Sequence, residues 1–368
     1  MRVRRSFRPI VAAALLLFAQ AAPALYSQTV NAVPTAPAGA APQKSSPLAP
    51  GGRATNEGSR QHLFFWKAAR GDAVLYLLAA IHLAGPDIYP LNPAITAAFE
   101  RSNALIVEVD IQALSPVELR NLMLKYAYYP ANDDLTHHLT PELLKQVLAA
   151  TGKAGLSQDT VERMRPWLLD TVLSTVDTGN SHLEATYGVD NHFLGLAHGS
   201  GMKIVSLETA AEQLSLISSL PVRLQIRSLK ETVSGLRGEG SDLGEIYNAW
   251  KSGDLERFRA VVVKPFQHDA EMRQLYQELF VRRNERWAVR VDRLFGFPAA
   301  PAGAATTEST SATGIGGEYT LQRGPAFLVV GAGHLIGPDN LRVLLEARGW
   351  KVSRVAPEAT LSPSANGL

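Results

Sequence analysis

Two histidines occupy nearly identical contexts in distant parts of the chain. His82 opens the segment HLAGPD and His334 opens HLIGPD, and each follows an apolar run, AVLYLLAAI in one case and FLVVGAG in the other. In α/β sheets, ligands bind at the carboxyl ends of strands. Two imidazoles at such ends can therefore point into one cleft and share a ligand. The alternative for each histidine is a structural side chain that bonds a neighbouring loop.

Glu108 is the third candidate, because its carboxylate falls inside the apolar run ALIVEVDI. If this run is a strand, alternation places Glu108 on the face opposite to Val107 and Val109. A carboxylate in so apolar a strand is costly to bury unless it is paired or bound to a metal. A salt bridge to an arginine is thus the alternative to a role as metal ligand.

His82, Glu108 and His334 together make a two-histidine, one-carboxylate set. Neutral imidazole and carboxylate suit zinc, manganese, cobalt or iron, and three protein ligands leave a position open for water. The chain has no HExxH motif, so nothing fixes the geometry of a metal site in advance. It also has no cysteine, so any metal site must use histidines and carboxylates.

Five further polar residues are candidates for catalysis or substrate binding. Glu208 ends an expected strand in VSLETAAEQ, where it can act as a ligand, a base or a helix cap. Arg283 and Asn284, in RRNERW, can present a guanidinium and an amide to a substrate carbonyl, unless they lie on a solvated helix face. Asp190, in YGVDNHF, and Arg165, in RMRPWL, are substrate-binding candidates, with a helix N-cap and a solvated face as the respective alternatives.

The expected elements form a strand–helix–strand unit near each end of the folded chain. Strands at 63–67 and 73–81 precede a helix with Asn92 as N-cap and Pro93 at N1, and the strand ALIVEVDI follows. The C-terminal unit comprises the strand PAFLVVGAGH, the helix GPDNLRVLLEAR and the strand WKVSRVA. Between the units, apolar residues recur at helical spacing, interrupted by the strand MKIVSLE. We therefore predict an α/β (α+β) fold, in which both units build a central mixed sheet around a large helical middle insertion.

The N-terminus has the pattern of a secretory signal peptide. Basic MRVRRSFRP, apolar IVAAALLLF and small-residue AQAAPA follow one another, which predicts a signal peptide over 1–24. An uncleaved membrane anchor is the alternative, although the apolar run is short for a bilayer span. We expect a periplasmic or secreted bacterial protein with no transmembrane segment after cleavage.

Low-complexity composition separates the remaining segments from the folded part. We predict a disordered Ala/Pro-rich tether at 25–61, a low-complexity loop at 298–317 and a disordered tail at 358–368, which leaves a single domain at 62–357. The formal net charge is +2, and removal of the four arginines among the first eight residues brings it to about −2. A near-neutral body offers no electrostatic footprint for nucleic acid, so that class of partner is set aside.

Several short motifs follow one another in an order typical of one family. They are LFFWKA, YLLAAIH, ALIVEVD, MRPWL, YGVD, SLETAAEQ, RRNERW and VVGAGHLIGPDNLRVLLEARGWKV. Together these motifs resemble the TraB/GumN (TraB/PrgY) family over the whole folded part. That family is related to the Tiki proteins, which look like metal-dependent proteases, and more distantly to erythromycin-esterase-like and ChaN-like folds.

The family hallmark is a pair of GxxH motifs with an acidic residue in a strand. GAGH at 331–334 matches fully and Glu108 matches the strand glutamate, whereas the first motif here is AAIH at 79–82. Ala79 thus replaces the first glycine, and its methyl group is expected near the site.

The resemblance implies an exported divalent-metal-dependent hydrolase that acts on peptide bonds. Manganese, cobalt or zinc is expected on His82 and His334, with Glu108 as third ligand or general base and with Arg283 and Asn284 stabilising the oxyanion. The alternative is a non-catalytic periplasmic protein that binds a peptide or small molecule, or regulates, through the same cleft. Convergence of the three ligands favours the hydrolase, and an arginine that already neutralises Glu108 favours the binding protein. The sequence does not determine the oligomeric state.

Overall fold

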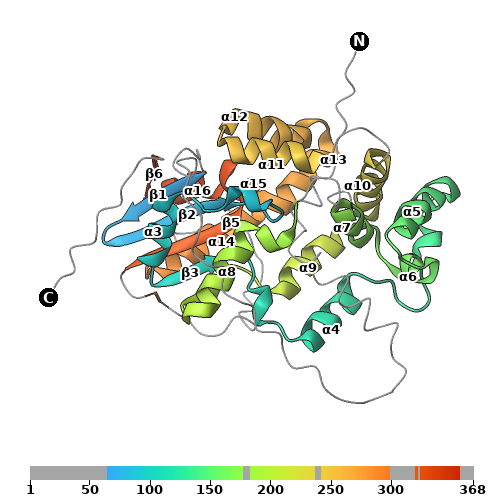
Figure 1. The fold of residues 1–368 in the computed structure, drawn as a ribbon, viewed down its shortest axis with the longest axis horizontal. Coiled ribbons are helices and arrows are strands. Elements are labelled where there is room, and N and C mark those ends of the chain that lie inside the picture. The colour runs from blue at the N-terminus through green and yellow to red at the C-terminus, as the bar shows by residue number, and fades with distance from the viewer. Residues whose placement is uncertain (1–63, 177–182, 237–241, 299–319, 322–323, 357–368) are drawn as a thin grey trace, which may run out of the picture.

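A computed structural model describes residues 64–176, 183–236, 242–298, 320–321 and 324–356 (Figure 1). In this part of the chain a single mixed sheet has the strand order β4-β3-β5-β2-β1-β6. The strands are β1 (Phe65–Arg70), β2 (Ala73–Ala80), β3 (Ala104–Val107), β4 (Lys203–Ser206), β5 (Pro325–Gly331) and β6 (Lys351–Arg354). The expected signal peptide, tether and tail, and all but the first residue of the 298–317 loop, lie outside the described residues.

The centre of the sheet combines the two ends of the chain. Strand β5 lies between β2 and β3 and is parallel to both, and β4 continues the parallel set beyond β3. Strand β1 is antiparallel to β2 and to β6. A mixed sheet built from N-terminal and C-terminal units around a helical middle is therefore confirmed. Because four adjacent strands are parallel, their carboxyl ends share one edge of the sheet.

Most of the middle of the chain is helical, and the helix start predicted at Asn92 is confirmed. Asn92 and Thr140 accept hydrogen bonds from the backbone N–H groups of Ala94 and Leu143 at the starts of α3 and α5. The helices are α3 (Pro93–Glu100), α4 (Pro116–Tyr126), α5 (Pro141–Lys153), α6 (Gln158–Arg163), α7 (Pro166–Val176), α8 (Val189–Ser200), α9 (Ala210–Ser219), α10 (Val222–Gly235), α11 (Asp242–Ser252), α12 (Leu255–Phe258), α13 (Ala270–Tyr276), α14 (Arg282–Leu294), α15 (Ala332–Ile336) and α16 (Leu341–Ala347).

Short 3-10 and π-helical turns complete the described part. The 3-10 turns are η3 (Pro86–Ile88), η4 (Ile111–Ala113), η5 (Leu135–His137), η7 (Ala185–Tyr187) and η9 (Lys264–Gln267). The π-helical turns are η8 (Arg259–Val263) and η10 (Gln277–Val281). None of the described helices is both long and apolar enough to cross a bilayer.

Helices α3 and α8 pack on one face of the sheet. Phe99 of α3, Phe193 of α8 and Phe327 of β5 form a buried aromatic cluster, with ring centroids 4.9–5.6 Å apart. Helices α5, α6, α7 and α10 gather at the far end of the molecule from β1 and β6 (Figure 1). The sheet edge that carries the candidate residues is therefore held by helices from the middle of the chain.

Several predicted elements have different bounds in the structure, and one difference concerns the site. Strand β3 ends at Val107, so Glu108 follows the strand directly and does not lie within it. In the helical middle, the segment DTVERMRPWLLDTVLSTV (159–176) is not one helix but is divided into α6 and α7 at Met164 and Arg165. Pro166 explains this division, because a proline disfavours helical geometry in the residue before it.

Helices α7 and α10 are joined by a buried carboxyl group that gives a testable pH dependence. Asp170 is fully buried and accepts hydrogen bonds from Ser228 Oγ and Thr232 Oγ1, both at 2.5 Å. Burial raises the pKa of Asp170 to about 6, although the two hydroxyl groups act to lower it. Its contribution to stability is thus complete below the unfolded-state pKa of 3.8 and is lost as pH rises through about 6.

We expect Asp170→Asn to remove this pH dependence. Between pH 3 and pH 7 the wild type should lose about 3 kcal/mol of unfolding free energy relative to the variant, because each unit of pKa shift corresponds to about 1.4 kcal/mol. Urea unfolding at several pH values measures this difference. A difference that does not change with pH would contradict the buried, protonated state of Asp170.

Candidate active site at the strand ends

Each of the four parallel strands delivers one buried polar residue at its carboxyl end. His82 follows β2, Glu108 follows β3, Glu208 follows β4, and His334 lies in α15, which begins where β5 ends. Their exposed fractions are 8%, 5%, 4% and 2%, so all four are buried together with the strand ends. The parallel arrangement of the strands therefore explains why residues far apart in sequence meet here.

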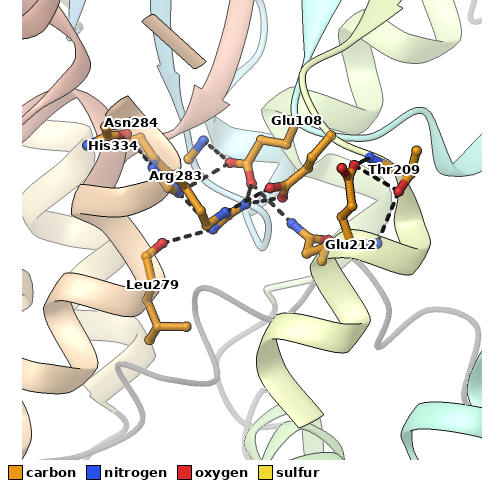
Figure 2. A network of polar contacts seen from close by, with 10 residues as sticks. Glu108, Thr209, Glu212, Leu279, Arg283, Asn284 and His334 are labelled. Carbon is orange, nitrogen blue, oxygen red and sulfur yellow. Dashed lines mark hydrogen bonds and ion pairs between the residues drawn. The ribbon is translucent and has the colours of Figure 1, made fainter. Parts of the chain in front are cut away.

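Arg283, from α14, lies at the centre of this group (Figure 2). Its Nη2 donates to Glu108 Oε2 at 2.6 Å and to Glu208 Oε1 at 2.5 Å, and its Nε donates to Glu208 Oε2 at 3.2 Å. Its Nη1 donates to the carbonyl oxygen of Leu279 at 3.1 Å and to His334 Nε2 at 3.0 Å. These contacts use all five N–H groups of the guanidinium. Oxyanion stabilisation by Arg283 therefore stays a prediction, and it requires one of these bonds to break.

Glu108 is held ionised by its surroundings. Its Oε1 accepts from the backbone N–H of Gly331 at 2.7 Å, and its Oε2 accepts from Gln213 Nε2 at 3.3 Å in addition to Arg283. Burial acts to raise the pKa of Glu108, but Arg283, the two histidines and the Gly331 N–H bring it down to about 2. Glu108 is thus a carboxylate at neutral pH. The salt bridge that the sequence left open as an alternative is formed with Arg283.

The His334 ring is fixed by an amide and by two aromatic rings. Its Nδ1 lies 2.7 Å from Asn284 Oδ1, while Asn284 Nδ2 donates to the carbonyl oxygen of Asp339 at 3.0 Å. The rings of Phe280 and Trp287 pack against the imidazole, with centroids 5.0 and 4.3 Å away. Burial, and then the charge of Arg283, lower the pKa of His334 to about 3. His334 is therefore neutral, with its proton on Nδ1 and the lone pair of Nε2 directed to Arg283.

His82 is fixed in the same way by a carboxylate. Its Nδ1 lies 3.0 Å from Asp190 Oδ2, and no hydrogen bond joins His82 Nε2 to another described residue. Burial acts to lower the pKa of His82, but the contact with Asp190 raises it above its ordinary value. Asp190 Oδ1 is buried without a hydrogen-bond partner in the described part of the chain. Asp190 thus orients His82 from behind, and an N-cap role is absent because Gly188 occupies that position.

The three predicted metal ligands lie around Gly331. A methyl group built on Gly331 would lie 3.2 Å from both Glu108 Oε1 and His82 Nε2, and His334 Nε2 lies 4.0 Å from Glu108 Oε1. His82, Glu108 and His334 also line one cavity of about 60 Å³. Among the described residues, however, no three His, Asp or Glu side chains already stand in an arrangement that holds a metal ion. The structure therefore brings the three groups together but leaves Arg283 among them.

The two GxxH-like motifs contribute differently to this geometry. Gly331 leaves space for Glu108 and His82, and Gly333 leaves space for Phe280, whose ring lies 2.4 Å from the position of a Gly333 Cβ. Ala79, in the first motif, is buried in β2, and its carbonyl oxygen accepts from Trp250 Nε1. The cavity is lined by Ala80 and not by Ala79. The expected methyl group of Ala79 is thus not part of the cavity wall.

One candidate from the sequence, Arg165, lies outside this group. Arg165 lies between α6 and α7, where its side chain donates to the carbonyl oxygen of Tyr128 and lies over the ring of Tyr129.

Three residues that contact the site were not identified from the sequence. Gln213, Phe280 and Trp287 have the pattern of ordinary helix residues in the sequence. The signal that could have found Gln213 is its place five residues after Glu208, on the buried face of the helix that follows.

The fold and the site together define a mixed α/β protein with a buried, charged centre at the carboxyl ends of four parallel strands. The chain belongs to the TraB/PrgY/gumN family, whose family model matches residues 64–354. It is similar to the uncharacterized protein YbaP of Escherichia coli (strain K12) and to that of Shigella flexneri. Each is 23% identical over 275 residues, which is 75% of this chain and 89% of the relative. No solved structure matches the chain.

Proposed function

We propose that this protein is an exported divalent-metal-dependent hydrolase that acts on peptide bonds at the His82–Glu108–His334 centre. The observation that carries the proposal is that both imidazole rings are oriented in the same way, by a hydrogen-bond partner on Nδ1. Each ring is held through Nδ1, His82 by Asp190 and His334 by Asn284, which places both Nε2 atoms on the side of the Glu108 carboxylate. Metal-binding histidines in proteins are oriented in this way by a partner on the other ring nitrogen.

The chemical types of the residues present suit a divalent cation, but two adjustments of their positions are needed. Two imidazoles that are neutral when they bind, and one ionised carboxylate, are suitable ligands for manganese, cobalt or zinc. Because the contact with Asp190 raises the pKa of His82, a proton on its Nε2 must leave when a cation binds. Ligands that share such a cation lie roughly 3–3.5 Å apart, so the 4.0 Å between His334 Nε2 and Glu108 Oε1 must shorten slightly. The Arg283 guanidinium must also move away from His334 Nε2, and because it is planar and rigid it moves as a whole; its two hydrogen bonds to Glu208 are the contacts that can remain.

In this proposal His82, His334 and Glu108 hold the cation, and their neighbours set the orientation and charge of these ligands. A bound divalent cation polarises a carbonyl group and lowers the pKa of water toward neutrality. Asp190 and Asn284 keep the two rings in place. Arg283 balances the charge of Glu108 and Glu208, and the N–H that it withdraws from His334 is the group nearest to serve an oxyanion. The kinship of the family with Tiki-like metalloproteases supports the reaction class, and the signal-like N-terminus supports export.

A binding protein without catalysis is the second candidate, and the state of Glu108 favours it. Arg283 already neutralises this carboxylate at 2.6 Å and occupies His334 Nε2. A protein in which Arg283 never moves would retain the cavity and the fixed rings but would have no place for a cation. The two candidates therefore differ in whether Arg283 releases His334.

A cleavage assay distinguishes the candidates. The purified protein is incubated with a mixed peptide library after chelation, and again after addition of Mn²⁺, Co²⁺ or Zn²⁺. We expect cleavage that disappears with chelator and returns with one of the three ions. Absence of cleavage under every condition, with peptides still retained by the protein, would reject the hydrolase and support the binding protein.

A pair of single substitutions tests the asymmetry of the two motifs. We expect Gly331→Ala to lower the rate of cleavage by about tenfold to 100-fold, because the added methyl group pushes Glu108 and His82 apart and misplaced groups lose catalysis steeply. Ala79→Gly should leave cleavage unchanged and lower the stability by about 0.5–1 kcal/mol, as expected for a glycine within a strand. Equal rates for wild type and Gly331→Ala would contradict the proposed placement.

A further inference from the structure

The cavity beside the centre has one polar side and one apolar side. The polar side is the row of strand ends with His82, Glu108 and His334. The opposite wall is formed by Leu183, Leu243, Ile246, Phe258, Val262 and Phe280. Apart from the three site residues, no charged, hydroxyl or amide side chain of the described residues lines it. A polar or charged group placed against this wall would lose its hydration without gaining a partner.

The cavity is small, which limits what can occupy it. A water-sized group needs roughly 10–15 Å³ of such space, so a cavity of about 60 Å³ holds about four to six groups. A leucine, isoleucine or methionine side chain, with four heavy atoms, matches this space best, whereas the indole group of tryptophan is too large for it. The volume therefore selects an aliphatic occupant from among the apolar ones.

Two π-helical turns bring the apolar wall to the site. Val262 belongs to η8 (Arg259–Val263) and Phe280 belongs to η10 (Gln277–Val281), and both turns contact α15, the helix that carries His334. Single π-helical turns are rare and occur frequently at functional sites, because the extra residue shifts the side chains that follow. Here η10 immediately precedes α14, which carries Arg283, and Phe280 packs on the His334 ring. The wall is thus continuous with the reaction centre.

We propose that this cavity is the specificity pocket for an aliphatic side chain of the substrate, on the residue next to the bond that is cleaved. This inference rests on the proposed function, because it takes His82, Glu108 and His334 as the reacting centre. It adds the substrate class: a peptide with leucine, isoleucine or methionine beside the scissile bond, in preference to glycine, lysine, glutamate or tryptophan.

The test uses two opposite substitutions at Val262 and one surface control. In the peptide library, we expect the wild type to cleave next to leucine, isoleucine or methionine with kcat/KM at least tenfold above glycine, since one or more buried methylene groups give roughly 10–200-fold discrimination. Val262→Phe should fill the pocket and shift the preference to alanine and glycine. Val262→Ala should widen it and shift the preference to phenylalanine. Val343→Phe, at an exposed position of α16, should change neither preference.

A binding arm separates failure of the pocket from failure of the hydrolase. N-acetyl-leucinamide, N-acetyl-lysinamide and N-acetylglycinamide are titrated calorimetrically into the wild type and into both Val262 variants. If the leucine amide binds more tightly than the other two amides, and Val262→Phe abolishes this difference, the pocket is supported. This holds even if no peptide is cleaved, because the absence of cleavage would reject only the hydrolase. Cleavage with no aliphatic preference, or with a preference that neither Val262 variant shifts, overturns the pocket and leaves the hydrolase standing.

Discussion

Arg283→Met should lower the free energy of unfolding by about 3–5 kcal/mol, the range observed when one partner of a buried ion pair is removed. The effect is large because two carboxylates depend on one guanidinium. Glu108 and Glu208 are 5% and 4% exposed, and both bond to Arg283 Nη2. Burial raises the pKa of Glu208 even with Arg283 in place. Without the guanidinium, the two acids would face each other as uncompensated buried charges.

The neighbouring residue provides the matched control. Arg282 is exposed, and its one ion pair within the described residues is with Glu278, one turn before it. Arg282→Met should therefore change the stability by no more than about 0.5 kcal/mol, as for other exposed helix pairs. Adding Glu208→Gln to Arg283→Met should restore part of the loss, because Glu108 keeps the Gly331 N–H and Gln213 as partners. Urea unfolding at neutral pH measures all three variants. Equal stability of the two methionine variants would contradict the buried three-charge cluster.

His82→Ala and His334→Ala should each abolish the binding of divalent cations. Each change removes one of only three ligands, and the two remaining groups cannot complete a site that already lacks a fourth protein ligand. Asp190→Asn should weaken binding less, by about 10- to 100-fold, since it disturbs only the orientation of His82. Elemental analysis and calorimetric titration with Mn²⁺ measure these losses on the purified protein.

The control for these histidines is one on the surface. The side chain of His137 is 63% exposed, and its ion pairs in the described part of the chain are with Asp133 and Asp134. His137→Ala should bind cations as the wild type does. If all three histidine variants retain wild-type binding, the cation is held elsewhere and the assignment of His82 and His334 as ligands is wrong.

The gathering of the site at one sheet edge follows from the sequence, because it depends on local patterns. Apolar runs mark β2 and β5, and the residue types at their ends, His82 and His334, mark the edge at which parallel strands terminate. The helix start at Asn92 is equally local, since its side chain caps an N–H group two residues away. Such short-range rules placed the sheet, its two end units and the helical middle.

The partners of the site residues could not be derived in this way, because they depend on how distant helices pack. Nothing near Asp190 in the sequence indicates that it bonds His82 across 108 residues. The sequence allowed for an arginine partner of Glu108, but it did not indicate which of the many arginines this would be. Arg283 lies in the first turn of α14, directly after the π-helical turn η10, and an inserted residue of this kind shifts the direction of the side chains that follow without any periodic signature in the sequence.

The most direct test of the central claim is a crystal structure of the protein grown with Mn²⁺, with data collected to reveal anomalous scattering from manganese. The account predicts an anomalous peak among His82 Nε2, His334 Nε2 and the Glu108 carboxylate, with the Arg283 guanidinium withdrawn from His334 and still bonded to Glu208. A map without a peak at this position, and with Arg283 still donating to His334 Nε2 at saturating Mn²⁺, would contradict it.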